Sequence, residues 1–283
     1  MLKIILSLFL FFSLTSLNIA FAETESNDEE SKWNFNWRAS LNGTQASYSN
    51  WSQGGVSNLA IIGTSVASAK FQSDKNVFSS TLDLRYGQTR VEDEDFRKSA
   101  DLIRWRSKYI RKLSDERWGL LGQVNLETQF DVGRNNDTNV IESDFFSPAY
   151  ITEILGINFQ PDEYFSASFG ASARQTIVMR DSLVTRYGVS EGENFRNELG
   201  FSLILEYERE VLPNIIYSGY LETFTNPTNN VFKSDFLFTN ELTGRITDNI
   251  SANFELSFQY NEDFIDEIQV KQILSVGISY VFR

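Results

Sequence analysis

The chain ends on Ile273-Leu274-Ser275-Val276-Gly277-Ile278-Ser279-Tyr280-Val281-Phe282-Arg283, and this stretch decides the fold. From Leu274 to Phe282 every even position holds an apolar or aromatic residue, whereas the odd positions are mostly small or polar. A period of two is that of a β-strand with one apolar face. A closing strand with an aromatic residue near its end is typical of bacterial outer-membrane β-barrels, in which the apolar face meets lipid and the other face lines a lumen.

The other end of the chain indicates export. Met1-Leu2-Lys3 gives a positive start, residues 4–17 are nearly all apolar, and Ala20-Phe21-Ala22 has the small-x-small pattern of a cleavage site. This combination predicts a signal peptide over residues 1–22 rather than a membrane anchor, because the apolar run is too short to span a bilayer well. Residues 23–32 contain no apolar residue and are expected to form a disordered, acidic periplasmic leader, which leaves residues 33–283 for the barrel.

The composition excludes several classes of protein. The 283 residues include no Cys and no His, the formal net charge is −13, and 14% of the residues are aromatic. Without these two residue types there is no disulfide scaffold, no Ser-His-Asp triad and no Cys or His metal site. A chain this acidic is also a poor binder of nucleic acid. We therefore expect no enzyme and no cofactor, although a site made of carboxylates alone, such as Glu206 with Glu208, stays open.

Turn signals divide residues 33–283 into twelve segments of strand character. Tight connections such as Ser114-Asp115-Glu116 alternate with mostly longer ones such as residues 132–147. Short periplasmic turns and long outer loops are the rule in outer-membrane barrels, and an even strand count puts both termini in the periplasm. The sequence therefore predicts an all-β, transmembrane, antiparallel up-and-down barrel of about twelve strands in the cell outer membrane. The expected strands are 33–48, 56–72, 77–91, 96–113, 117–131, 148–160, 164–180, 195–210, 215–225, 231–246, 250–261 and 265–282.

The expected outward face is apolar along nearly every strand. In residues 250–261, for example, the even positions from Ile250 to Tyr260 are apolar and the odd ones are polar. A soluble β-sandwich is the alternative, but it could not expose so many aromatic side chains. Outward aromatic residues next to the connections would form two interfacial girdles. These are Phe71, Phe78, Trp118, Phe159, Phe165, Tyr207 and Phe282 toward the periplasm, and Phe130, Phe195 and Tyr260 toward the outside.

The expected inward face is unusually charged. Arg104, Arg106 and Lys108 alternate in one strand, with Lys98 above them and Lys112 below. Buried charges must pair or stay wet, so two interpretations remain open. A basic strip could face an acidic strip across a narrow channel for small polar or charged solutes, or a salt-bridge network could fill the lumen of a non-conducting barrel that binds a partner or ligand through its outer loops. The expected lumen residues are Asp83, Arg85, Arg104, Arg106, Lys108, Glu127, Arg174, Glu206, Glu208, Asp235, Glu241 and Arg245.

The expected outer loops are acidic, and Glu92-Asp93-Glu94-Asp95 places four acids in a row. Clustered carboxylates suit calcium, but their spacing matches no EF-hand loop. A solvated loop is therefore the favoured interpretation over a calcium site.

Three motifs resemble one protein family. They are Asn50-Trp51-Ser52-x-Gly54-Gly55-x-x-Asn58, Phe96-Arg97-Lys98-Ser99-x-Asp101 and Thr128-Gln129-Phe130. In order and approximate spacing they are similar to the Bacteroidota outer-membrane proteins grouped as domain of unknown function 3078, over nearly the whole mature chain. The resemblance implies an exported β-barrel without an established activity. Tyr280 and Phe282 would supply the signal that the barrel-assembly machinery recognises, although Arg283 follows the last aromatic residue.

Overall fold

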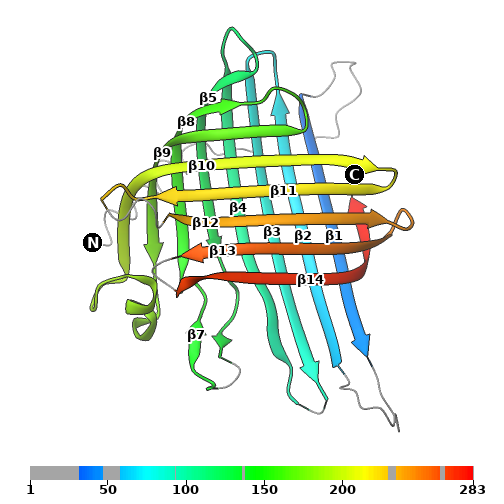
Figure 1. The fold of residues 1–283 in the computed structure, drawn as a ribbon, viewed down its shortest axis with the longest axis vertical. Coiled ribbons are helices and arrows are strands. Elements are labelled where there is room, and N and C mark those ends of the chain that lie inside the picture. The colour runs from blue at the N-terminus through cyan, green and yellow to red at the C-terminus, as the bar shows by residue number, and fades with distance from the viewer. Residues whose placement is uncertain are drawn as a thin grey trace, which may run out of the picture. The chain divides into compact units, whose positions relative to one another are not determined.

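The computed structural model describes residues 32–46, 58–92, 94–135, 138–228, 234–261 and 265–282. In these residues the chain forms a closed antiparallel β-barrel of twelve strands, so the predicted fold class is confirmed (Figure 1). The predicted signal peptide and nearly all of the acidic leader lie outside the described residues, and so do Asn50, Trp51, Gly54 and Gly55 of the first motif.

The barrel strands follow one another around the wall in chain order. A small hairpin, β6 (Gly133–Arg134) with β7 (Ile141–Ser143), stands between β5 and β8, and two short 3-10 turns, η1 (Asp181–Leu183) and η2 (Thr185–Tyr187), stand between β9 and β10. The described residues contain no helix with the length and apolar character needed to cross a membrane. The barrel strands are β1 (Trp33–Ala46), β2 (Asn58–Gln72), β3 (Asn76–Val91), β4 (Arg97–Lys112), β5 (Trp118–Thr128), β8 (Ala149–Phe159), β9 (Phe165–Ile177), β10 (Phe195–Leu212), β11 (Ile215–Thr225), β12 (Asp235–Arg245), β13 (Ile250–Asn261) and β14 (Ile265–Phe282).

The closing strand β14 completes the barrel by pairing with β1. The register runs from Trp37 opposite Phe282 to Gly43 opposite Val276. The tight connections β2–β3, β4–β5, β8–β9, β10–β11 and β12–β13 gather at one end of the barrel, the short-turn end, and the other connections lie at the long-loop end. Because the strand count is even, β1 begins and β14 ends at the short-turn end. Figure 1 shows β2, β3 and β4 crossing behind β10 to β13, as expected for opposite walls of tilted strands.

The outward face of the barrel is apolar. Leu155, Leu199 and Leu274 expose 75%, 68% and 66% of their surface, a degree of exposure that water would penalise and lipid would not. Aromatic rings gather where the girdles were predicted. Trp118 lies 4.6 Å from Phe159 at the short-turn end, measured between ring centroids, and Phe236 lies 6.2 Å from Tyr260 at the long-loop end.

A bulge in β4 overturns the predicted position of Lys98 above the lumen ladder. The register between β3 and β4 shifts by one residue after Gly87, so that Tyr86 lies opposite Asp101 and Gln88 opposite Lys98. Residues directly opposite each other in a ladder share a face, and Tyr86 is on the outward one. Lys98 therefore lies on the outward face together with Asp101.

Candidate functional site

The lumen contains a cavity of about 800 Å³. Its lining extends from Gln160 and Glu163, at the short-turn end, to Ser99 and Leu102 in the half of β4 nearer the long-loop end. A smaller cavity of about 100 Å³ lies beyond it toward the long-loop end. The two cavities share Arg104, Arg106 and Glu127, so these side chains lie at the boundary between them.

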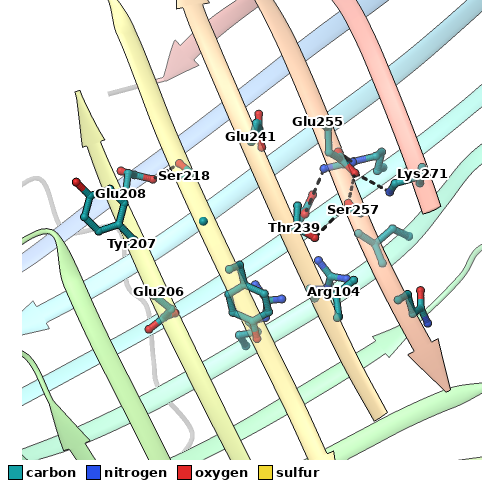
Figure 2. A pocket seen from close by; sticks show the side chains of 18 of the residues that line it. Arg104, Glu206, Tyr207, Glu208, Ser218, Thr239, Glu241, Glu255, Ser257 and Lys271 are labelled. Carbon is teal, nitrogen blue, oxygen red and sulfur yellow. Dashed lines mark hydrogen bonds and ion pairs between the residues drawn. The ribbon is translucent and has the colours of Figure 1, made fainter. Parts of the chain in front are cut away.

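Basic and acidic side chains face each other across the larger cavity. Arg85 on β3 and the alternating residues Arg104, Arg106 and Lys108 on β4 form the basic strip, which projects from one wall. Lys108 itself lines neither cavity, but it pairs with Glu206, which lines the larger one. The acidic strip consists of Glu206 and Glu208 on β10, Glu241 on β12 and Glu255 on β13. Figure 2 shows the four residues of the acidic strip around the same space as Arg104.

Three contacts cross the lumen from the basic strip. Arg85 Nη1 donates to Glu255 Oε2 at 2.7 Å, which joins β3 to β13. Lys108 forms an ion pair with Glu206 on β10. The Arg106 guanidinium lies 4.0 Å from the centroid of the Tyr220 ring on β11, a cation–π geometry. These contacts tie opposite walls together and narrow the passage between them.

Further charged pairs lie nearer the long-loop end. Arg104 Nε donates to Glu127 Oε2 at 2.7 Å on the neighbouring strand. Arg174 on β9 forms an ion pair with Asp235 on β12, and its guanidinium lies 3.9 Å from the centroid of the Phe224 ring. The pairing of nearly every lumen cation is what a partly desolvated interior requires.

One side of the lumen is filled. Ile110, Leu121, Ile154 and Ile204, from β4, β5, β8 and β10, pack together inside the barrel, and Ile154 and Ile204 are each 1% exposed. The sequence reasoning missed this internal apolar cluster. The alternation that places Lys108 in the lumen also places Ile110 there, and the register sets Leu121 opposite Ile110. That continuation of the alternation was the signal that could have found it.

The charges of the lining do not balance. Glu208 accepts a hydrogen bond from Ser218 Oγ at 3.2 Å, and Glu241 accepts one from Thr243 Oγ1 at 3.4 Å. In the described part of the chain, no Lys or Arg lies within ion-pair distance of either carboxylate. Acidic residues outnumber basic ones in the lining of the larger cavity: Asp83, Asp101, Glu127, Glu163, Glu206, Glu208, Glu241 and Glu255 stand against Arg85, Arg104, Arg106 and Lys271. Arg245 lines neither cavity, because it lies at the short-turn end of β12 and bonds Glu210 at 3.3 Å.

The second and third motifs come together at the rim of the long-loop end. Lys98 Nζ donates to Asp101 Oδ2 and to the Asp131 carbonyl oxygen, each at 2.8 Å. The Asp101 carboxylate also accepts the backbone N–H groups of Phe130, at 2.7 Å, and of Asp131, at 3.0 Å. The Lys98–Asp101 clamp therefore fixes the path of the chain as it leaves β5.

The other residues of the third motif hold the same loop. Thr128 Oγ1 donates to the Pro148 carbonyl oxygen at 3.0 Å, and Gln129 Nε2 donates to the carbonyl oxygens of Asp144 and Ser147 at 2.7 and 2.9 Å. Asn58, from the first motif, begins β2 and pairs with Ala46 and Val91. In the described residues these motif positions are structural contacts at the barrel rim.

The long loops on either side of β8 and β9 pack into a common cap. Val178, Leu183, Val184, Tyr187 and Val189 form its apolar core, with Ile141 against them. Arg186 bonds Glu142 at 2.9 Å, and the Tyr187 hydroxyl donates to the Glu142 carbonyl oxygen at 2.7 Å. Burial raises the pKa of Tyr187 to about 12. Within the residues that the structure describes, no group of three or more acidic side chains is placed to hold a metal ion.

A closed barrel with an apolar outward face and a charged lumen defines a transmembrane β-barrel protein. The model of the family described as protein of unknown function (DUF3078) matches residues 44–133, so the resemblance is confirmed over that segment. All three motifs fall inside it, although the match is shorter than the nearly complete coverage expected from the sequence.

No curated protein matches the sequence. Solved structures similar in fold include the outer membrane channel from Pseudomonas putida F1, at 11% identity over 92% of this chain and 99% of that chain with a TM-score of 0.42. The translocator domain of the autotransporter NalP from Neisseria meningitidis is 10% identical over 90% of each chain, with a TM-score of 0.36. The outer membrane channel DcaP of Acinetobacter baumannii is 8% identical over 88% of this chain and 97% of that chain, with a TM-score of 0.31. This likeness concerns the barrel fold alone.

Proposed function

We propose that this protein is an outer-membrane channel with a narrow lumen, through which small polar or charged solutes diffuse passively. The observation that carries the proposal is the cavity of about 800 Å³, which extends from the short-turn end past the middle of the barrel and is lined by charged side chains. In this proposal the short-turn end, where β1 begins and β14 ends, faces the periplasm, and the barrel-assembly machinery inserts the exported chain into the outer membrane.

In this proposal Arg106 forms a constriction of the channel. This residue borders both cavities, and its guanidinium reaches across the lumen to the Tyr220 ring. A solute that passes must move beside this contact or displace it. Oriented charges at a constriction select solutes by size and charge, so the channel should pass small hydrophilic solutes and exclude larger ones.

Planar-bilayer recording of the purified protein tests the proposal. The expected result is a set of discrete conductance steps that become larger in Arg106→Ala, because this substitution removes the contact between the two walls. Arg117→Ala is the matched control, since Arg117 lies in an exposed turn beside Asp115 and should leave the step size unchanged. Silent bilayers over a range of voltages, with protein that migrates as a folded barrel on unheated gels, would refute the channel.

A second function is favoured by the ordered cap. The cap has an apolar core and ion pairs such as Arg186–Glu142, which loops that merely surround the mouth of a pore do not require. The alternative is a non-conducting barrel that presents this cap to a partner or ligand. A photo-crosslinker at Val140, which is 58% exposed on the cap, would then capture a partner on intact cells. Retention of that partner after removal of residues 181–193 would count against binding through the cap.

A further inference from the structure

The basic strip of the lumen carries little uncompensated charge. Arg85 is paired with Glu255, Lys108 with Glu206, and the adjacent Arg104 with Glu127. Arg106, in turn, stacks on Tyr220. An ion pair has a weak field at a distance because its two charges largely cancel. Among the described residues the basic strip is therefore left with one charge that no ion pair cancels, that of Arg106.

The acidic strip keeps two carboxylates without such compensation. Glu208 and Glu241 accept hydrogen bonds from the hydroxyls of Ser218 and Thr243, and among the described residues neither has an ion-pair partner. Both line the larger cavity. Figure 2 shows Glu208 on β10 and Glu241 on β12, the strands on either side of β11. Glu163, at the short-turn end of the same cavity, continues the line of carboxylates toward the mouth.

We infer that the lumen prefers cations to anions, so that the solutes of the channel are small cations, either inorganic or organic amines. The inference rests on the channel proposed above and assigns its solute class. Uncompensated carboxylates in a water-filled passage with low-dielectric walls lower the energy of a cation and raise that of an anion, because the walls focus the field along the passage. Glu208 and Glu241 are the residues that set the preference.

The test is the zero-current potential in a planar bilayer with a potassium chloride gradient. The unmodified protein should show a permeability for potassium several-fold above that for chloride. The double variant Glu208→Gln with Glu241→Gln should bring this ratio close to one while conductance persists. Glu153→Gln is the matched control: Glu153 lies opposite Val124 on the outward face of β8, so the same neutralisation outside the lumen should leave the ratio unchanged.

The outcomes separate the inference from the proposed function. A conducting protein with a ratio at or below one overturns the cation preference and leaves the channel standing. A ratio above one that the double variant does not lower overturns the assignment to Glu208 and Glu241. A folded protein that never conducts overturns the channel and the inference with it.

Discussion

Replacement of Asp101 by Ala should release the chain that follows β5 from the barrel rim. The Asp101 side chain is only 3% exposed, and its carboxylate accepts hydrogen bonds from Lys98 Nζ, from the Phe130 N–H and from the Asp131 N–H. Alanine removes the acceptor of all three donors. Lys98 then keeps a largely buried ammonium group without its counter-charge, which is costly, whereas Phe130 and Asp131 are exposed residues whose N–H groups can turn to water.

The structure sets the size of the effect. Removal of one partner of a buried ion pair costs about 3–5 kcal/mol. Lys98 is 18% exposed and keeps its bond to the Asp131 carbonyl oxygen, so part of its hydration and one of its contacts survive. We therefore expect Asp101→Ala to lower the free energy of unfolding by about 2–4 kcal/mol. Asp101→Asn keeps an acceptor oxygen but loses the charge. Its free energy of unfolding should therefore lie between those of the unmodified protein and of Asp101→Ala.

Urea unfolding of the barrel in phospholipid vesicles, followed by tryptophan fluorescence, measures this loss. Asp115→Ala is the control, because it removes an aspartate that pairs with Arg117 in an exposed turn and should not move the midpoint. Limited proteolysis adds a local measurement, since cleavage within residues 131–148 should become faster only in the Asp101 variants. Equal midpoints for Asp101→Ala and Asp115→Ala would refute the clamp.

Three further predictions concern other parts of the barrel. Gly156→Ala should fail to refold, because the new Cβ would overlap the Phe169 carbonyl oxygen, whereas Gly63→Ala meets nothing closer than 3.8 Å and should refold normally on unheated gels. Burial raises the pKa of Tyr187 to about 12, above its ordinary value of about 10. The neutral hydroxyl therefore contributes fully to the free energy of unfolding below pH about 10, and this contribution is lost as the pH rises through about 12. The ultraviolet difference titration between the unmodified protein and Tyr187→Phe should therefore centre near the upper value, and a midpoint near the lower one would contradict burial. Glu153→Leu should raise the free energy of unfolding by up to about 1 kcal/mol, because it removes a charge from the lipid-facing surface; a lower value in the urea assay would count against that placement.

The sequence predicted the barrel well because every strand obeys the same constraint. Lipid on one side and a lumen on the other impose alternation along the whole strand, so residues 250–261 and 273–282 each identify their own face. The bulge at Ser99 broke this rule. One extra residue in β4 moves Lys98 to the outward face, and its only mark in the sequence is a run of polar residues that fits either register. The motif around Asp101 pointed to the right residues without indicating that they act together as a clamp.

Cross-lumen partners could not be predicted in the same way. Adjacent strands pair in chain order, so the proximity of Arg104 and Glu127 follows from the hairpin between β4 and β5. The meeting of Arg85 with Glu255 depends instead on the tilt and stagger of the closed barrel, which bring β3 opposite β13. A single sequence gives the face of each residue but not its height in the barrel, and pairing across the lumen requires both.

The two interpretations that the sequence left open apply to different sides of one lumen. Where β5, β8 and β9 form the wall, the inward side chains are almost completely buried, as Asn158 and Ser168 show at 2% and 1% exposure, and they pack around the apolar cluster of Ile154 and Ile204. Where β3, β4, β12 and β13 form the wall, charged side chains surround the cavity. A filled side stiffens the barrel by packing, so the hollow side needs fewer charge pairs for rigidity. Carboxylates such as Glu241 can then stay without an ion-pair partner and remain available to a solute.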